Sequence, residues 1–448
     1  MARWNSLQSL VEAEIVERRE EGCDVTGFQG RVAACGGNLD RLMEVYQELS
    51  ALPVRPDFPY REPDELEEIL AASSGGTEQM AAPVDPDTLA DRMEGAWLGR
   101  CIGCAMGKPF ETAPFHAGNE QGPGFAHIRR WLEGAKAYPL TGYVPGISTA
   151  ADTGLSLICP ASQKENIAFM ETDDDIRYLV VGLLMAEKYG NEFNPDQVSE
   201  MWHNYLPLFQ CWTAERQAYI NSLNAEFTDP AARWEYYRRH LNPFREWIGA
   251  QIRVDQYGYV NAGNPLLAAK TAYQDARFSH TKNGVYGAMF VAAMIAAAFT
   301  EKDPERCVEI GLSVVPTTSR LYADVRMAME AARTAKTQEE VFEQLWSRFS
   351  YSWVHTNNNA AACVAALLFG KGDFRTTLAM AVSCGWDTDC NGATLGSIMG
   401  ALYGAAAIPA DLKDPLHDPL YSFIPGFHPT SIADCAKRSL AVYRRLHG

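Results

Sequence analysis

Two stretches of the chain carry glycine at every fourth position, and this spacing restricts the fold more than any other feature. The two sets are Gly95, Gly99, Gly103 and Gly107, and Gly392, Gly396, Gly400 and Gly404. Glycine inside a helix costs roughly 1 kcal/mol relative to alanine, so this many glycines need a structural reason. A spacing of four residues places each set along one helix face, where another helix can then come unusually close. The sequence therefore predicts two buried, tightly packed helices that hold rigidly any chemistry at their ends.

The rest of the pattern predicts an all-α protein, an orthogonal bundle of many helices. From residue 88 onward one segment after another has helical spacing of its apolar residues, and sustained strand-like alternation is almost absent. The apolar run Ala288–Phe299 has roughly half the length of a membrane span and predicts a buried core helix. Residues 112–170 are rich in glycine, proline, serine and threonine, which predicts long loops.

The N-terminal part differs in composition from the remainder of the chain. Residues 1–71 show helical patterns that are broken by glycine- and proline-rich stretches, and residues 72–86 are small, polar and proline-bearing, as in a linker. We therefore expect a helical extension and linker over residues 1–87 and one large helical domain over residues 88–448. A regulatory or oligomerisation role is a further hypothesis for residues 1–87.

The net charge and the cysteines indicate which binding partners and which cellular compartment to expect. The chain has 39 basic and 56 acidic residues, a net charge of −17, without a marked basic cluster. Such a chain is expected to repel nucleic acid and anionic lipid. The 11 cysteines are scattered without a framework spacing, and early acidic residues argue against a secretory signal. These features predict a cytoplasmic protein with reduced thiols that binds neither nucleic acid nor membrane.

Two acidic clusters each precede a helix with a clear apolar face. They are Glu171-Thr172-Asp173-Asp174-Asp175 and Asp387-Thr388-Asp389-Cys390-Asn391, the second at the start of a glycine-ridged helix. Either cluster alone could simply cap a helix N-terminus. Taken together, their carboxylates need compensation when they are buried, and a divalent metal such as Mg²⁺ or Mn²⁺ would provide it.

Other polar and aromatic residues have weaker functional signals. Glu111 follows the first glycine-ridged helix, and a glutamate in that position is commonly just solvated. His280 and Asn358 belong to polar clusters before apolar helices, where they could cap a helix or line a cleft that binds sugar hydroxyls. The aromatic residues of segment 200–260 could form the core or the wall of a pocket for a flat ring.

Three motifs in order resemble the ADP-ribosylglycohydrolase family over roughly residues 88–448. The first runs from Asp91-Arg92 through the glycine ridge to Gly107-Lys108-Pro109-Phe110-Glu111. The second is Thr172-Asp173-Asp174, and the third is Gly385-Trp386-Asp387-Thr388-Asp389-Cys390-Asn391-Gly392-Ala393-Thr394. The resemblance implies an all-α bundle with a two-metal centre in a central cleft. It also implies hydrolysis of a bond to ribose, by default in an ADP-ribosylated protein or small molecule.

The resemblance also assigns roles to individual residues. Thr172, Asp173 and Asp174 would bind one Mg²⁺ or Mn²⁺ ion, and Asp387 and Asp389, with Cys390 beside them, would bind a second. Glu111, Asp174 and Asp387 would be the catalytic residues, with Glu111 as a general base or a ligand. The expected substrate-binding residues are Trp386, Gly385, His280 and Asn358.

The chain departs from the family pattern at three places. Cys104 stands where the family commonly has aspartate, and Cys390 where it has a serine or threonine ligand. Since a thiol is a poor partner for Mg²⁺, the second metal is the less certain one. Trp386 replaces a frequent glycine and should reshape the cleft. Two alternatives therefore stay open, a non-catalytic binder of ADP-ribose or of a partner, and a hydrolase of a smaller ribosyl or sugar glycoside.

Overall fold

The structure, a computed structural model, describes residues 5–75 and 82–448 and is almost entirely helical. Within these residues the only strands are β1 (Pro419–Leu420) and β2 (Thr430–Ser431), which pair antiparallel. The prediction of an all-α fold is therefore confirmed. Among the same residues, no helix combines the length and apolar character needed to cross a membrane.

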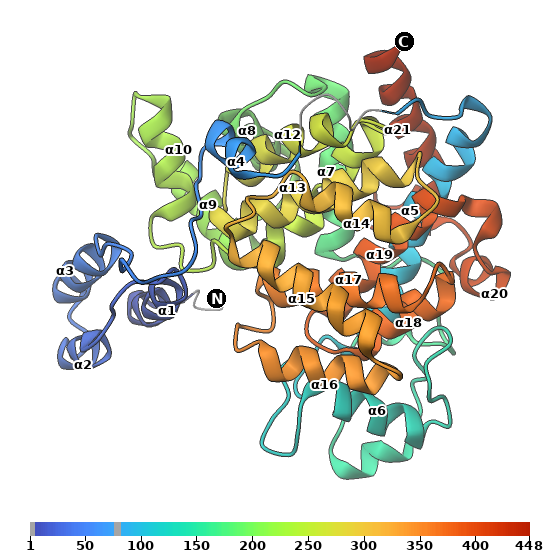
Figure 1. Cartoon of the computed structure of the whole chain (residues 1–448), viewed down its shortest axis with the longest axis horizontal. Coiled ribbons are helices and arrows are strands. Elements are labelled where there is room, and N and C mark those ends of the chain that lie inside the picture. Colours follow the sequence, from blue (N-terminus) through green and yellow to red (C-terminus); the bar gives the residue numbers. More distant parts are fainter. Residues whose placement is uncertain (1–4, 76–81) are drawn as a thin grey trace.

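The two glycine-ridged segments form α5 (Pro86–Gly107) and α19 (Thr388–Tyr403), here called the central pair, which lie against each other in the right half of Figure 1. The helices run antiparallel, so that Gly95, Gly99 and Gly103 face the backbone of Gly400, Gly396 and Gly392. A methyl group added at Gly99 would lie 2.0 Å from the carbonyl oxygen of Gly396. The helices touch backbone to backbone, which explains why both faces lack side chains.

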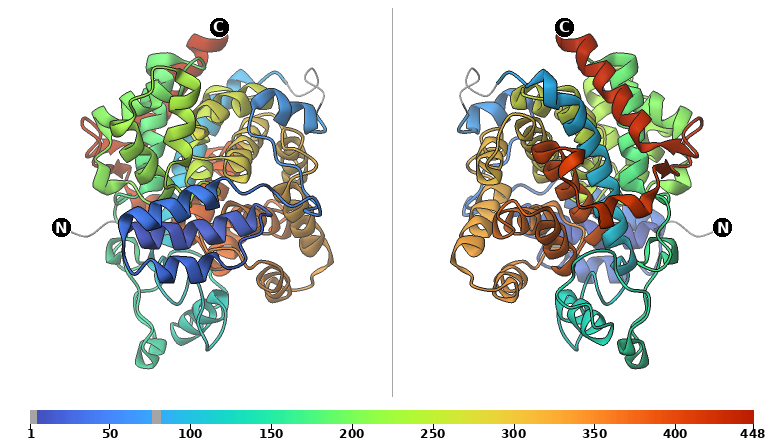
Figure 2. Two further views of the ribbon diagram at one scale, coloured as in Figure 1. Left: turned by 90° about the vertical axis from the view of Figure 1, so that its left-hand side faces the viewer. Right: turned by 90° about the vertical axis from the view of Figure 1, so that its right-hand side faces the viewer.

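The helix α13 (Lys282–Ala298) confirms the predicted core helix, because it is buried on every side apart from its first residue. The following helices surround the central pair and α13 (Figures 1 and 2): α12 (Pro265–Ala276), α14 (Pro304–Leu312), α15 (Arg320–Thr334), α17 (Thr356–Phe369) and α18 (Phe374–Ser383). The remaining helices of the main body are α7 (Asp174–Tyr189), α8 (Pro195–Tyr205), α9 (Thr213–Asn224), α10 (Pro230–Arg239), α11 (Asp255–Val260), α16 (Gln338–Arg348), α20 (Ala410–Lys413) and α21 (Ile432–His447).

The prediction of long loops over residues 112–170 was partly wrong, because this segment contains α6 (Gly124–Gly134). One face of α6 buries His127, Ile128, Trp131 and Leu132. The glycines and prolines around this short helix conceal its apolar face in the sequence. The rest of the segment is irregular apart from short 3₁₀ turns, two of them at Thr149–Thr153 and Pro160–Ser162.

The N-terminal residues form α1 (Leu7–Glu20), α2 (Phe28–Ala34), α3 (Leu39–Ser50) and α4 (Leu66–Ala72). The first three lie beside the main body and share a small apolar core of their own (Figure 2). The predicted linker, residues 72–86, connects α4 to α5, and residues 76–81 of it lie outside the described residues. The division at residue 87 stays a prediction.

Candidate active site

The antiparallel pairing of α5 and α19 brings three acidic segments together. Gly107 at the end of α5 lies against Thr388 at the start of α19, whose hydroxyl donates to the Gly107 carbonyl at 2.9 Å. Glu111 follows the 3₁₀ turn Lys108–Phe110 at the end of α5, and Asp387 directly precedes α19. The N-terminus of α7, with Asp173 as its cap, meets the same place, where the carboxylates of Asp173 and Asp389 belong to one cluster.

A lysine neutralises the first aspartate of α7. The Lys108 ammonium donates to the Asp173 carboxylate at 2.5 Å and to the Thr172 carbonyl at 3.1 Å. Although burial disfavours the charged carboxylate, Lys108 and Arg177 hold the pKa of Asp173 well below its usual range. The Thr172 hydroxyl accepts from Arg177 at 2.8 Å. Both residues, which the sequence predicts as metal ligands, thus already have protein partners.

Asp175 is committed to a buried ion-pair network. The fully buried Arg100 guanidinium donates to Asp175 at 2.7 Å and to Asp255 at 2.6 Å. Arg100 is held on α5, so this network ties the central helix to the start of α7 and to α11. Removing one partner of such a network leaves a buried charge without compensation, which is strongly destabilising.

The remaining carboxylates repel one another. Burial and the charge of Asp173 raise the pKa of Asp174 to about 8, and the same two causes raise the pKa of Asp389 to about 6. Burial and Asp389 raise the pKa of Asp387 well above its usual value, and the pKa of Glu111 rises for the same reasons. Without a metal ion, these carboxyl groups therefore keep protons that a bound cation would displace.

The donor atoms at this place fit a hard divalent cation. The carboxylates of Asp387 and Asp389 and the Cys390 thiol offer ligand atoms within 4.8 Å of one another, as do Cys104, Asp173, Asp175 and Asp389. One oxygen of Asp389 is buried without a hydrogen-bond partner. Oxygen donors suit Mg²⁺ and Mn²⁺. Burial raises the pKa of both thiols well above the usual value, so each stays protonated and is a weak ligand.

A cavity of about 330 Å³ opens directly beside these carboxylates. The three residues expected to be catalytic, Glu111, Asp174 and Asp387, all line it, together with Cys390. The opposite walls come from α9, from the segment before α11 and from the loop before α17. They consist of Tyr178, Trp212, Thr213, Glu215, Trp247, Ile248, Gly249, Ile252, Trp353 and Val354.

The residues expected to bind substrate do not line this cavity. Gly385 and Trp386 both have positive φ, 83° and 59°, and form the turn before Asp387. The Trp386 indole is buried and stacks on Trp346 with ring centroids 4.9 Å apart. The indole is not among the residues that line this cavity, and its expected effect on the shape of the cleft stays a prediction.

His280 and Asn358 lie behind the cavity wall, where both are fully buried. His280 Nε2 lies 3.7 Å from a Glu215 oxygen, and burial, with the Arg253 charge, lowers the pKa of His280 well below its usual value. The Asn358 amide donates to the carbonyls of Ser352 and Trp353. Neither side chain lines the cavity. His280 lies behind Glu215, and Asn358 holds the loop that carries Trp353.

Several wall residues were not predicted individually from the sequence. Trp212 and Trp247 belong to the aromatic-rich segment 200–260, which was predicted only as a whole to form core or a pocket wall. Trp353 is 106 positions away from Trp247 in the numbering, yet the backbone of Ile248 donates to Val354 at 2.8 Å. Glu215 lies on α9, which carries no motif, and Tyr178 lies on α7 beyond the motif at the start of that helix. Only the packing of distant segments creates this wall.

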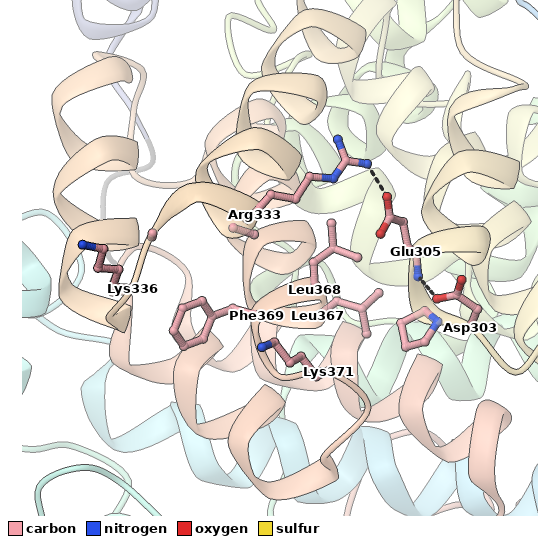
Figure 3. Close-up of a pocket in the computed structure, with 11 residues that line it drawn as sticks. Asp303, Glu305, Arg333, Lys336, Leu367, Leu368, Phe369 and Lys371 are labelled. Carbon is pink, nitrogen blue, oxygen red and sulfur yellow. Dashed lines mark hydrogen bonds and ion pairs between the residues drawn. The ribbon is translucent and has the colours of Figure 1, made fainter.

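A second pocket, of about 800 Å³, lies between α14, α15 and α17 (Figure 3). Its residues include Arg333, Lys336 and Lys371 over an apolar floor of Leu367, Leu368 and Phe369. Arg333 forms an exposed ion pair with Glu305. This pocket shares no lining residue with the carboxylate cavity. Exposed ion pairs are screened by solvent, so its charges do not form a comparable reactive centre.

The site thus consists of carboxylates gathered between the ends of helices beside a cavity, in an almost entirely helical fold. The model of the ADP-ribosylglycohydrolase family matches residues 85–446. The chain belongs to the ADP-ribosylglycohydrolase family and is a hydrolase that acts on glycosidic bonds.

The comparison with solved structures found 45 matching chains. One of them, described as an "ADP-ribosylglycohydrolase-related protein complex", is 19% identical, with a TM-score of 0.48. The alignment covers 80% of this chain and 99% of that chain. No curated protein matches the sequence.

Proposed function

We propose that this enzyme hydrolyses the bond between ribose and its substituent in ADP-ribose-type substrates, with Mg²⁺ or Mn²⁺ as cofactor. The observation that carries the proposal is the convergence of Glu111, Asp174 and Asp387 on one cavity, with a buried oxygen of Asp389 left without a partner. Carboxylates placed in this way are costly to bury unless they bind a cation. Family membership supports the reaction class.

The ligands are proposed from the geometry and the motifs. Asp387 and Asp389, with Cys390 beside them, would hold one ion, and Thr172, Asp173 and Asp174 would hold a second. The second ion is the weaker one, because Lys108 already neutralises Asp173. A bound cation would supply positive charge that offsets the carboxylates and polarises sugar hydroxyls or water.

The protein side chains would then move the proton and stabilise the sugar. Glu111 lines the cavity, and once a bound cation has displaced the proton that burial favours, its carboxylate would act as a general base that accepts a proton from the attacking water. Departure of the group on ribose C1 builds positive charge on the sugar, which the Asp174 and Asp387 carboxylates would stabilise. The walls around Ile248 and Val354 would limit the entry of bulk water.

Calorimetric titration with Mg²⁺ and Mn²⁺ tests the metal site directly. We expect binding to the wild type, and its loss in the double variant Asp387→Asn/Asp389→Asn. The matched control is Asp87→Asn/Asp152→Asn, which removes the same two charges from exposed positions. Failure of the wild type to bind either ion would overturn the metal proposal.

A second experiment tests the base. Glu111→Gln should retain metal binding and lower kcat on ADP-ribosylated arginine by about 10²–10⁴-fold. The control is Glu120→Gln, an exposed change in the same segment of the chain. Full activity of Glu111→Gln would remove Glu111 from the mechanism.

A further inference from the structure

The cavity has two chemically different sides. The carboxylates of Glu111, Asp174 and Asp387 form one side, and aromatic rings dominate the other. Trp247 and Trp353 are half-buried, Trp212 is 52% exposed, and Tyr178 is buried. Flat indole faces bind a planar ring by stacking and favour no particular polar group. A ligand with a sugar at one end and a flat ring at the other would match both sides.

The cavity wall also lacks a positive charge. None of the described residues that line it is a lysine or an arginine, whereas four of them are carboxylates: Glu111, Asp174, Glu215 and Asp387. If metal ions neutralise the three that surround the proposed metal site, Glu215 remains as the carboxylate on the aromatic side, and its ion-pair partner Arg253 is not among the lining residues. A phosphate group placed there would meet a carboxylate instead of a cation.

The cations nearest to the cavity are already engaged. Arg253 donates to Glu215 at 2.8 Å and also binds Asp275, and Lys108 binds Asp173. The Arg216 guanidinium lies over the Trp212 ring, 4.6 Å from its centroid, and donates to the Cys211 carbonyl at 2.7 Å. Recruiting any of them to a phosphate would break contacts that the fold uses.

The backbone at Gly249 does not provide a phosphate-binding site on the aromatic side of the cavity. A methyl group added to Gly249 would lie 1.9 Å from Glu215 Oε1, so the carboxylate packs directly on that backbone. An anion cannot take the place next to Gly249 while Glu215 is ionised there. Glu215 is buried and held by Arg253, so its position is fixed by the protein.

We propose that the cavity accepts a phosphate-free ribonucleoside, with the ribose toward the carboxylates and the base between the tryptophans. Glu215 Oε2, which Thr213 approaches at only 3.5 Å, would accept a hydrogen bond from an N–H group of the base. A cavity of about 330 Å³ is near the lower end of ligand pockets, about 300–1,000 Å³, and suits a compact ligand. This inference rests on the proposed hydrolysis of a bond to ribose, and it replaces the ADP-ribose-type substrate of that proposal with an N-riboside that carries no diphosphate.

Calorimetry on the full chain with Mg²⁺ tests the inference. The probes are adenosine, guanosine, uridine and cytidine, their 5′-monophosphates, and ADP-ribose. We expect at least one nucleoside to bind, and its monophosphate and ADP-ribose to bind at least about tenfold more weakly. Equal or tighter binding of the phosphorylated ligands, or no binding of any nucleoside, would overturn the inference.

Variants of the wall separate recognition from folding. Trp247→Leu should weaken nucleoside binding by about tenfold, whereas Trp234→Leu, which changes a half-buried tryptophan outside the cavity, should not. Glu215→Gln should reduce the preference for a nucleoside over its monophosphate. A merely structural role of Glu215 would alter both affinities equally, and that outcome would contradict our assignment.

Failure of the two proposals can be told apart. Nucleoside binding without any metal-dependent hydrolysis would overturn the proposed function and leave this inference standing. Metal-dependent cleavage of ADP-ribosylated arginine, with ADP-ribose bound more tightly than every nucleoside, would overturn only the inference.

Discussion

At the scale of single residues, the site contains more carboxylates than cationic side chains that could neutralise them. Lys108 forms an ion pair with Asp173, and Arg100 forms one with Asp175. Among the described residues, no cationic side chain lies within hydrogen-bonding distance of Asp174, Asp387 or Asp389. The structure thereby distinguishes adjacent aspartates that look equivalent in the sequence. The middle aspartate of the first cluster faces the cavity, and its neighbours are used to hold the fold together.

We predict that metal affinity rises with pH between about pH 6 and pH 8. Burial raises the pKa of Asp174 to about 8 and of Asp389 to about 6, and a cation binds only the ionised carboxylates. In the unfolded chain these groups ionise near pH 4. Between pH 4 and pH 8 the folded, metal-free protein therefore holds more protons, and its stability falls as pH rises.

Thermal unfolding with EDTA and with Mg²⁺ at pH 5, 6, 7 and 8 tests the predicted pH dependence of stability and of metal affinity. The melting temperature with EDTA should fall across the series, while Mg²⁺ should raise it most at pH 8. The double variant Asp387→Asn/Asp389→Asn provides the reference without the two charges, and its EDTA series should be flatter. A Mg²⁺ effect that shrinks with increasing pH would contradict the prediction.

The second residue-scale prediction concerns Arg100. Arg100→Met leaves Asp175 and Asp255 buried without their cation, so the free energy of unfolding should fall by about 3–5 kcal/mol. Urea unfolding followed by circular dichroism measures the loss. Arg129→Met is the matched control, because the Arg129–Glu133 pair is half exposed and screened by solvent, so its loss should leave the urea midpoint nearly unchanged.

At the scale of secondary-structure elements, the contact between α5 and α19 determines where every site residue lies. Gly99→Ala would place a methyl group 2.0 Å from the Gly396 carbonyl, and Gly396→Ala would place one 1.9 Å from the Gly99 carbonyl. Neither backbone can yield alone, because both helices are buried. We expect each variant to lose at least about 3 kcal/mol of stability or to remain unfolded.

The control for both glycines is Gly30→Ala. Gly30 lies within α2, and a methyl group there would meet nothing within 4 Å. This change should stabilise the protein slightly, by up to about 1 kcal/mol, because alanine favours the helix. Urea midpoints of the three variants give the comparison. Wild-type stability in Gly99→Ala would show that the two helices can separate at little cost.

The same contact shows what the sequence could predict about the elements. Eight glycines with one spacing predicted two closely packed helices, because helix geometry is a local property. The chain gave no means of deciding that the two ridges face each other, or that Glu111 would thereby meet Asp387. The motifs identified the acidic side of the cavity, but Trp247 and Trp353 come together only through tertiary packing.

At the scale of the whole molecule, the N-terminal helices are attached to the enzyme body by buried ion pairs. Arg245 donates to Glu14 at 2.8 and 2.9 Å and to Glu21 at 3.1 Å, and Lys282 lies 3.0 Å from Glu21. Burial disfavours the charged guanidinium, but the acids raise the pKa of Arg245 well above its usual value. In the sequence the same glutamates resemble an ordinary solvated helix surface, which is why this attachment could not be predicted.

The attachment leads directly to the cavity. Leu10 and Ala13 of α1 pack with Ala214, Phe244 and Trp247. From there Glu246 accepts a backbone hydrogen bond from Thr356, and the Asn359 side chain accepts one from the Asp387 backbone. A continuous series of contacts thus connects α1 to a proposed metal ligand. We propose that the helices α1–α4 are a fixed part of the catalytic unit.

The variant Arg245→Met tests this proposal on the full chain. It leaves Glu14 and Glu21 without their arginine in a buried interface, so we expect a loss of about 3–5 kcal/mol and faster trypsin cleavage near α1. Arg55→Met is the control, since Arg55 pairs with Asp57 at an exposed position. If α1 became sensitive to trypsin while the body kept its unfolding transition and metal affinity, the N-terminal helices would be a separable module. If the stability of the body and its metal affinity both fell, α1 would support the cavity wall. The described contacts of Arg245 do not include the carboxylates of the proposed metal site, so the effect would have to pass through α1.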